Sequence, residues 1–142
     1  MHQYKKNQHG FTLMEILIVV VILSILAITV VPQFLDEPDK ARVVRAQQDI
    51  QSLNTALSMY KLDNFNYPST SQGLQALVLK PGGQPDARNW KPGGYVQKLP
   101  DDPWGNPYQY LNPGNRAAVD IYSFGADGQP GGEGLDSDIG NW

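Results

Sequence analysis

The chain begins with a long, uninterrupted run of apolar residues. Residues 16–31 carry no charge, and the wider window 11–35 adds a single charged side chain, that of Glu15. A helix of about 20 apolar residues is long enough to span a bilayer. A domain of this size could not cover so continuous an apolar surface with its own core. We therefore expect residues 11–35 to form a retained transmembrane helix.

The pattern changes after Pro32 and Pro38 to that of an amphipathic helix. Its apolar residues recur at alternating spacings of three and four, which places them on one face: Val43, Ala46, Ile50, Leu53, Leu57 and Tyr60. This helix is expected to start near Asp39 and to end near Asn64. If Pro32 only kinks the chain, both segments form one helix over about residues 11–62.

The second half of the chain is rich in residues that disfavour helices. Residues 1–62 contain one Gly and two Pro, whereas residues 63–142 contain 13 Gly and nine Pro. This composition predicts short strands, turns and ordered loops. We predict a short helix that begins near Thr70 and points three residues inward: Leu74, Leu77 and Val78. We also predict strands at 108–111 and 119–124, joined by a turn at 112–115. The predicted fold is α+β, with the amphipathic helix packed on a small antiparallel sheet.

Composition and charge exclude several classes of function. The 142-residue chain has 11 Lys and Arg against 14 Asp and Glu, so it lacks the basic field of a nucleic-acid-binding protein. It has no Cys, and its two histidines, His2 and His9, both precede the apolar segment. A Ser-His-Asp triad and a His- or Cys-ligated metal are therefore not expected in the second half. An enzyme would depend on carboxylates such as Asp101 and Asp102, which we assign to turns, so we expect no enzymatic activity.

Glu15 is unusual because it is a lone carboxylate in an apolar helix. Such a group costs about 2.5–3.5 kcal/mol at the bilayer centre, and less near the interface. Either Glu15 has a partner outside its own helix, or it reaches the headgroups. Basic residues flank the apolar segment on both sides, so charge counting leaves its orientation open: Lys5, Lys6, Lys40, Arg42 and Arg45.

The end of the chain collects acidic residues without bases. No Lys or Arg follows Arg116, but five acids do: Asp120, Asp127, Glu133, Asp136 and Asp138. A hard cation such as Ca²⁺ would compensate this charge. The spacing is not that of an EF-hand, and a solvated acidic tail is the alternative interpretation.

The amino-terminal junction "HGFTLMEILIVVVILSILAITVVP" resembles the signal of type IV pilins and type II secretion pseudopilins. The resemblance implies that residues 1–10 are a leader and that a prepilin peptidase cuts between Gly10 and Phe11 and methylates the new terminus. It also implies that Glu15 acts in assembly and that the amino end is cytoplasmic.

The second half resembles the major pseudopilins of the type II secretion system. The segments that carry this likeness are "MYKLDNFNYPSTSQGLQALV", "LPDDPWGNPYQYLNPG", "VDIYSFGADG" and "DIGNW". The resemblance implies a pilin-like fold, a periplasmic domain at 36–142 and a Ca²⁺ site. Its ligands would be carboxylates and two backbone carbonyls: Asp127, Asp136 and Asp138, with Phe124 and Gln129.

This family forms homo-oligomeric helical filaments that grow from the bacterial inner membrane. The resemblance implies minor pseudopilins, an inner-membrane assembly platform and a secretin channel as partners in the export of folded proteins. In such a filament, Glu15 of one subunit is expected to pair with the Phe11 amine of a neighbour and so set the register. The alternatives are an adhesion or motility pilin and a membrane-anchored, calcium-dependent binding module with Trp90 or Trp104 as an exposed platform.

Overall fold

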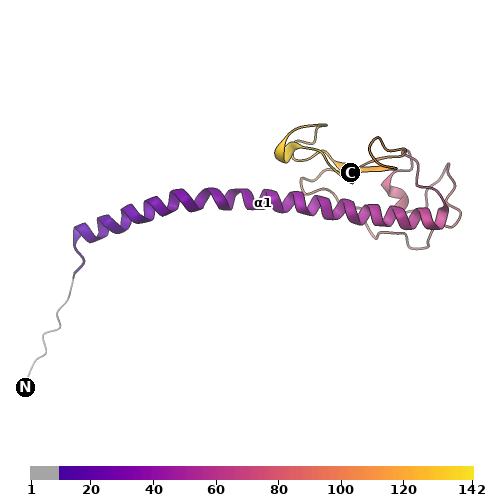
Figure 1. Cartoon of the computed structure of the whole chain (residues 1–142). Helices are drawn as coiled ribbons and strands as arrows, with labels where there is room; N and C mark the ends of the chain where they lie inside the picture. The colour runs from indigo at the N-terminus through magenta and orange to yellow at the C-terminus, as the bar shows by residue number, and fades with distance from the viewer. Residues whose placement is uncertain (1–9) are drawn as a thin grey trace, which may run out of the picture. The chain divides into compact units, whose positions relative to one another are not determined.

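The computed structural model describes residues 10–142, except for the side chains of residues 29–37. The chain divides after Pro38 into two compact units. A single 52-residue helix, α1 (Leu13–Asn64), contributes to both and runs through Pro32 and Pro38 (Figure 1). The sequence left open whether the helix continues through Pro32, and the structure shows that it does.

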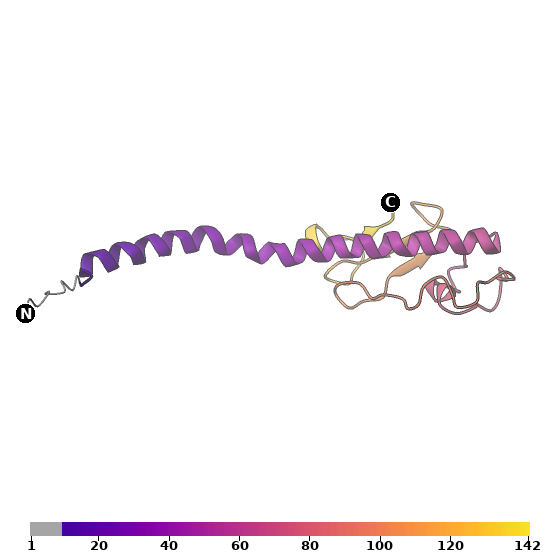
Figure 2. The same ribbon diagram turned by 90° about the horizontal axis from the view of Figure 1, so that it is seen from below.

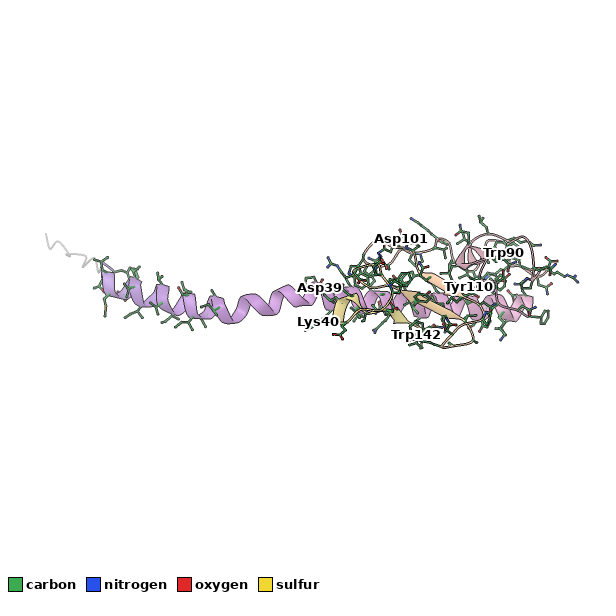
Figure 3. All side chains as sticks on the ribbon, turned by 90° about the horizontal axis from the view of Figure 1, so that it is seen from above. Asp39, Lys40, Trp90, Asp101, Tyr110 and Trp142 are labelled. Carbon is green, nitrogen blue, oxygen red and sulfur yellow. The ribbon has the colours of Figure 1, made fainter. Side chains whose placement is uncertain are left out.

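The first unit exposes apolar side chains around the helix. Between Phe11 and Ile28, the exposed fractions of the large apolar side chains range from 47% at Val19 to 93% at Leu13 (Figure 3). Among the side chains that the structure describes, no helical stretch is both long enough and apolar enough to cross a bilayer. The predicted span at 11–35 includes residues 29–35, whose side chains lie outside the described residues.

In the second unit, α1 buries the predicted apolar face. Val43 is half-buried and packs against the core. The other five residues of the stripe are at most 2% exposed: Ala46, Ile50, Leu53, Leu57 and Tyr60. The core is completed by Tyr108, Tyr110 and Ile121 from the strand region. Figure 2 shows the strands alongside the carboxyl-terminal half of α1. The three-and-four spacing therefore identifies the packed face of the helix.

The sheet has three antiparallel strands in the order β1-β2-β3. These are β1 (Gln109–Leu111), β2 (Asp120–Ser123) and β3 (Ile139–Gly140). In the register, Tyr110 pairs with Ile121 and Ser123 pairs with Ile139. The predicted strands at 108–111 and 119–124 are confirmed with slightly shorter limits, whereas β3 was not predicted.

Two one-turn 3₁₀ helices complete the unit. The segment expected to be a helix from Thr70 forms only η1 (Leu74–Leu77), preceded by turns. The second, η2 (Gly134–Asp136), lies in the loop 124–138, which we call the acidic loop. Leu74 and Leu77 are buried as predicted, while Val78 is half-buried. The backbone at Gly73 has a φ of 61°, which an α-helix entering from Thr70 could not accommodate.

Two tyrosine hydroxyls tie the sheet to the helix and its following loop. Tyr108 donates to the Asp49 carboxylate at 3.0 Å, and Tyr110 donates to the Pro68 carbonyl at 2.8 Å. Burial, followed by the hydrogen bond to Asp49, raises the pKa of Tyr108. Both phenols therefore remain neutral donors and hold the sheet in place over α1.

Candidate functional site

The predicted cleavage residues lie outside the regular helix. Gly10 precedes α1, and a side chain added at its Cα would meet nothing within 4 Å. Phe11 is 79% exposed. The fold of the chain therefore imposes no need for glycine at position 10, so a requirement for it would come from a partner. Residues 1–9 of the predicted leader lie outside the described residues.

Glu15 is exposed in the first turn of α1. Its backbone N–H donates to Oγ1 of Thr12 at 3.2 Å, so Thr12 acts as the helix N-cap. A carboxylate in the first turn also interacts favourably with the helix dipole. Sequence reasoning missed the role of Thr12, although threonine followed by glutamate three residues later is the signature of a capping box.

The acidic loop brings together two of the five predicted calcium ligands. Phe124 and Asp138 line the same cavity, together with Arg116, Asp120 and Trp142. Asp138 is half-buried, and both of its carboxylate oxygens accept the Gly131 N–H at 3.1 Å. Each oxygen retains acceptor capacity beyond this shared bond.

The other three predicted ligands do not line that cavity. Asp127 is exposed and accepts the Gln129 N–H at 3.0 Å, which forms a local turn. Asp136 is exposed within η2. Over the side chains described between residues 10 and 142, no three Asp, Glu or His groups are placed to hold a metal ion together.

Asp120 has a different role from the other acids of the tail. It is 2% exposed, and its carboxylate accepts the N–H groups of Asn115, Arg116 and Ala117. Burial alone would raise the pKa of Asp120, but these hydrogen bonds and the Arg116 charge lower it. Asp120 thus organises the turn between β1 and β2.

Of the two carboxylates considered for catalysis, Asp101 and Asp102, the second organises a turn, as predicted. Oδ1 of Asp102 accepts the N–H groups of Trp104 and Asn106, and Oδ2 accepts the Ser123 hydroxyl at 2.6 Å. Its neighbour Asp101 is exposed and forms an isolated bridge with Pro107. Asp102 therefore joins the turn to β2.

The two tryptophans considered as a binding platform pack against the core. Trp90 is half-buried, and its indole N–H donates to the Ala76 carbonyl at 2.8 Å. Trp104 is half-buried against the same core. Neither side chain provides the freely exposed ring that the calcium-dependent binding module would need.

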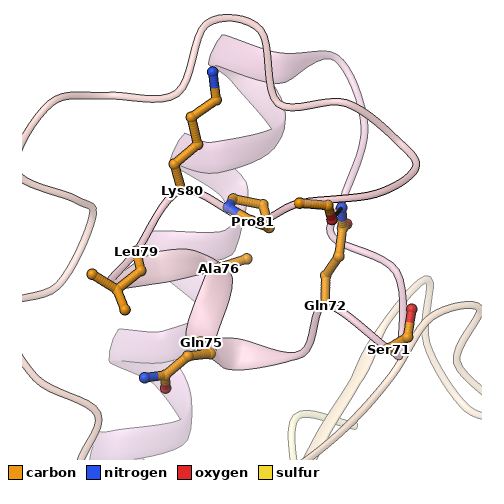
Figure 4. A pocket seen from close by; sticks show the side chains of 8 residues that line it. Ser71, Gln72, Gln75, Ala76, Leu79, Lys80 and Pro81 are labelled. Atoms are coloured by element: carbon orange, nitrogen blue, oxygen red, sulfur yellow. Dashed lines mark hydrogen bonds between the residues drawn. The ribbon is translucent and has the colours of Figure 1, made fainter.

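A shallow pocket lies beside η1 (Figure 4). Its lining includes Gln72, Gln75 and Lys80. The Gln72 amide nitrogen donates to the carbonyls of Gly82 and Pro85, both at 3.0 Å. These bonds attach the following loop to η1 and give Gln72 a structural role.

Two family models cover nearly the whole chain. The model described as type II secretion system (T2SS), protein G matches residues 33–142. The prokaryotic N-terminal methylation motif matches residues 5–31, which include Gly10, Phe11 and Glu15.

Curated relatives match along almost their entire length. The type II secretion system core protein G of Pseudomonas aeruginosa is 60% identical over 138 residues, covering 97% of each chain. That of Vibrio cholerae is 56% identical over 137 residues, covering 96% of this chain and 93% of the relative. A crystal structure of the major pseudopilin from the type 2 secretion system of enterohaemorrhagic Escherichia coli aligns with a TM-score of 0.70 at 50% identity, covering 80% of this chain and 96% of that one.

Proposed function

The chain belongs to the type II secretion system protein G family, the major pseudopilins, and from this premise we propose that it polymerises through its N-terminal helix. The helical filament would consist of many copies of the mature chain. It would grow from the inner membrane with minor pseudopilins and an assembly platform, and drive folded proteins through a secretin. The amino end would be cytoplasmic before assembly, and residues 36–142 would lie in the periplasm.

The observation that carries this proposal is the single charge of the apolar segment. Glu15 stands in the first turn of a helix whose described apolar side chains are all exposed up to Ile28. Cleavage after Gly10 would create an amine on Phe11 that stays cationic after one methylation. Both charges are costly in an apolar filament core unless they are paired. Pairing between neighbours would therefore favour one axial register.

The proposal predicts a specific defect when the charge is removed. Replacing Glu15 with Gln should leave membrane insertion intact or improve it, because a charge is removed from an apolar helix. Fibre yield should fall, because the Phe11 amine loses its partner. Both can be measured by membrane fractionation and by quantifying sheared fibres.

Ser24→Ala provides a matched control on the same helix. Its hydroxyl donates to the Val20 carbonyl at 2.7 Å, so the variant loses a polar contact without a change of charge. Fibre yield from this control should be close to that of the wild type. A normal yield from the Glu15→Gln variant would contradict the pairing.

We also propose that the loop from Phe124 to Asp138 binds Ca²⁺. The support is that residues 117–142 contain five acids and no base, although Arg116 lines the cavity that Phe124 and Asp138 share. Calcium takes six to eight oxygen ligands, which include backbone carbonyls as well as carboxylates. The donor types present fit such an ion: the Phe124 and Gln129 carbonyls with Asp127, Asp136 and Asp138. The bound ion would offset the loop's negative charge.

A further inference from the structure

The carboxyl end of α1 carries an exposed apolar pocket. Met59 and Leu62 are 49% and 78% exposed, and they lie three residues apart on one face of the helix. With Asp63, Lys91 and Tyr95 they line a cavity of about 280 Å³. This surface is separate from the buried stripe of α1, and no part of the described chain covers it.

The walls of this pocket are held by hydrogen bonds. The Tyr95 hydroxyl donates to the Asp63 carboxylate at 2.9 Å and accepts the Asn64 amide at 3.0 Å. The Lys91 backbone N–H also donates to that hydroxyl. The Lys91 ammonium forms no ion pair with any described residue. The walls of the pocket are therefore held in place, and its lining contains one acid, Asp63, and one base, Lys91.

The acidic loop presents a side chain that matches this pocket. Leu135 is 38% exposed at the centre of η2, two residues after the exposed Glu133. The loop is braced, because the Ala126 N–H donates to the Leu135 carbonyl at 2.9 Å and the Ser137 hydroxyl donates to the Gly134 carbonyl at 2.7 Å. Leu135 is thus an apolar knob on an ordered loop with a carboxylate beside it.

The sequence segments that contribute Lys91 and Leu135 carry opposite net charge. Residues 79–98, which include Lys91, contain four bases and one acid. The segment that carries Leu135 follows Arg116 and contains no base. Within the unit 39–142, η2 and the carboxyl end of α1 lie at opposite ends, so the knob and the pocket of one copy do not meet (Figures 1 and 2).

We propose that Leu135 of one copy inserts into the Met59–Leu62–Tyr95 pocket of a second copy, with Glu133 facing Lys91. A knob and a pocket at different places on one molecule form a heterologous contact, which builds an open filament when it does not close. The inference rests on the proposed function, since it assigns a contact within the filament. Neither Leu135 nor Glu133 is among the proposed calcium ligands, although Leu135 neighbours one of them, Asp136.

Disulfide cross-linking in assembled fibres of the full chain tests this contact. The chain has no cysteine, so the doubly substituted Leu62→Cys, Leu135→Cys chain contains only the two introduced thiols. Oxidised fibres should yield covalent dimers and longer ladders. In the control, Leu79→Cys replaces Leu62→Cys, since Leu79 is 61% exposed but does not line this pocket, and ladders should be absent.

The outcomes separate this inference from the proposed function. If the wild type forms no fibres, the proposed function fails. If fibres form but the Leu62–Leu135 pair gives no ladder, gives no more than the control, or links to a different protein, the contact is wrong. If the introduced cysteines prevent fibre formation, variants that exchange the charges at positions 91 and 133 test the contact instead. Lys91→Glu and Glu133→Lys should each reduce fibre yield, and the double swap should restore it; a double swap no better than either single variant overturns the contact.

Discussion

At the scale of single residues, carboxylates in this chain organise loops as well as carry charge. Asp102 and Asp120 are both buried, and each accepts several N–H groups from its own turn. A count of charges along the sequence places Asp120 with the acids proposed to bind calcium. Such a count cannot show which N–H groups a carboxylate will accept. The turn role of Asp102 was predictable, since proline, glycine and paired acids surround it.

Replacing Asp120 with Asn should destabilise the second unit. The two Asp120 oxygens accept three N–H groups, and the amide NH₂ of Asn would face one of these donors. Leaving a buried donor unsatisfied costs about 1–3 kcal/mol. For a domain of this size, each kcal/mol corresponds to about 4–8 °C in melting temperature. Thermal unfolding of residues 36–142 at pH 7 measures the loss.

The pH dependence of the same variant gives a second check. The pKa of Asp120 is lowered from its ordinary value of 3.8. A carboxyl with a lowered folded pKa stabilises fully above the unfolded pKa, and this stabilisation is lost as pH falls through the folded pKa. The difference between wild type and Asp120→Asn should therefore narrow below pH 3.8. A difference that is equal at pH 7 and at pH 2 would show that the Asp120 charge is unimportant.

At the scale of elements, periodicity predicted the long helix well and the short elements poorly. Six apolar positions at helical spacing identify the packed face of α1, because that face repeats over five turns. The strand β3 has only two residues and is defined by its pairing with Tyr122 and Ser123. No local pattern encodes such a strand. A side chain at Gly140 in β3 would require the Trp142 ring, which occupies that space, to move.

Calcium binding to the acidic loop should raise the thermal stability of the second unit. Ligand binding to the native state alone stabilises it by about 2.7 kcal/mol at a hundredfold excess over Kd. We expect residues 36–142 to melt at a higher temperature in calcium than in chelator. Magnesium should substitute poorly, because it prefers tight octahedral geometry and retains its water. Differential scanning calorimetry in each buffer measures the shifts.

Two single variants distinguish calcium binding at the acidic loop from a general effect of removing one acidic side chain. Asp138→Ala removes the carboxylate that shares a cavity with Phe124 and should abolish the calcium-dependent shift. Asp101→Ala removes an exposed acid from a different turn and should preserve it. If the wild type melts at the same temperature in calcium and in chelator, the loop is a solvated acidic segment.

At the scale of the whole molecule, the chain combines a stable domain with a segment that it leaves uncovered. The unit 39–142 has its own core, whereas the described apolar side chains from Phe11 to Ile28 are all exposed. Hydrophobic patterning alone predicted this difference between the two units, because no apolar segment of the second half is large enough to cover the apolar N-terminal helix. The contact partners of this segment were not predictable in detail, since the proposed function places them in other copies or in lipid.

The measurement that tests this account most directly is the intact mass of the subunit in fibres, combined with electron microscopy. Cells that contain a prepilin peptidase and the secretion machinery should yield thin fibres of this chain. Their subunit should begin at Phe11, lack the first ten residues and carry one added methyl group. The Gly10→Val variant should keep its leader and give no fibres, because a branched side chain would block the peptidase. Absence of wild-type fibres, or fibres whose subunits retain Met1, would contradict the account.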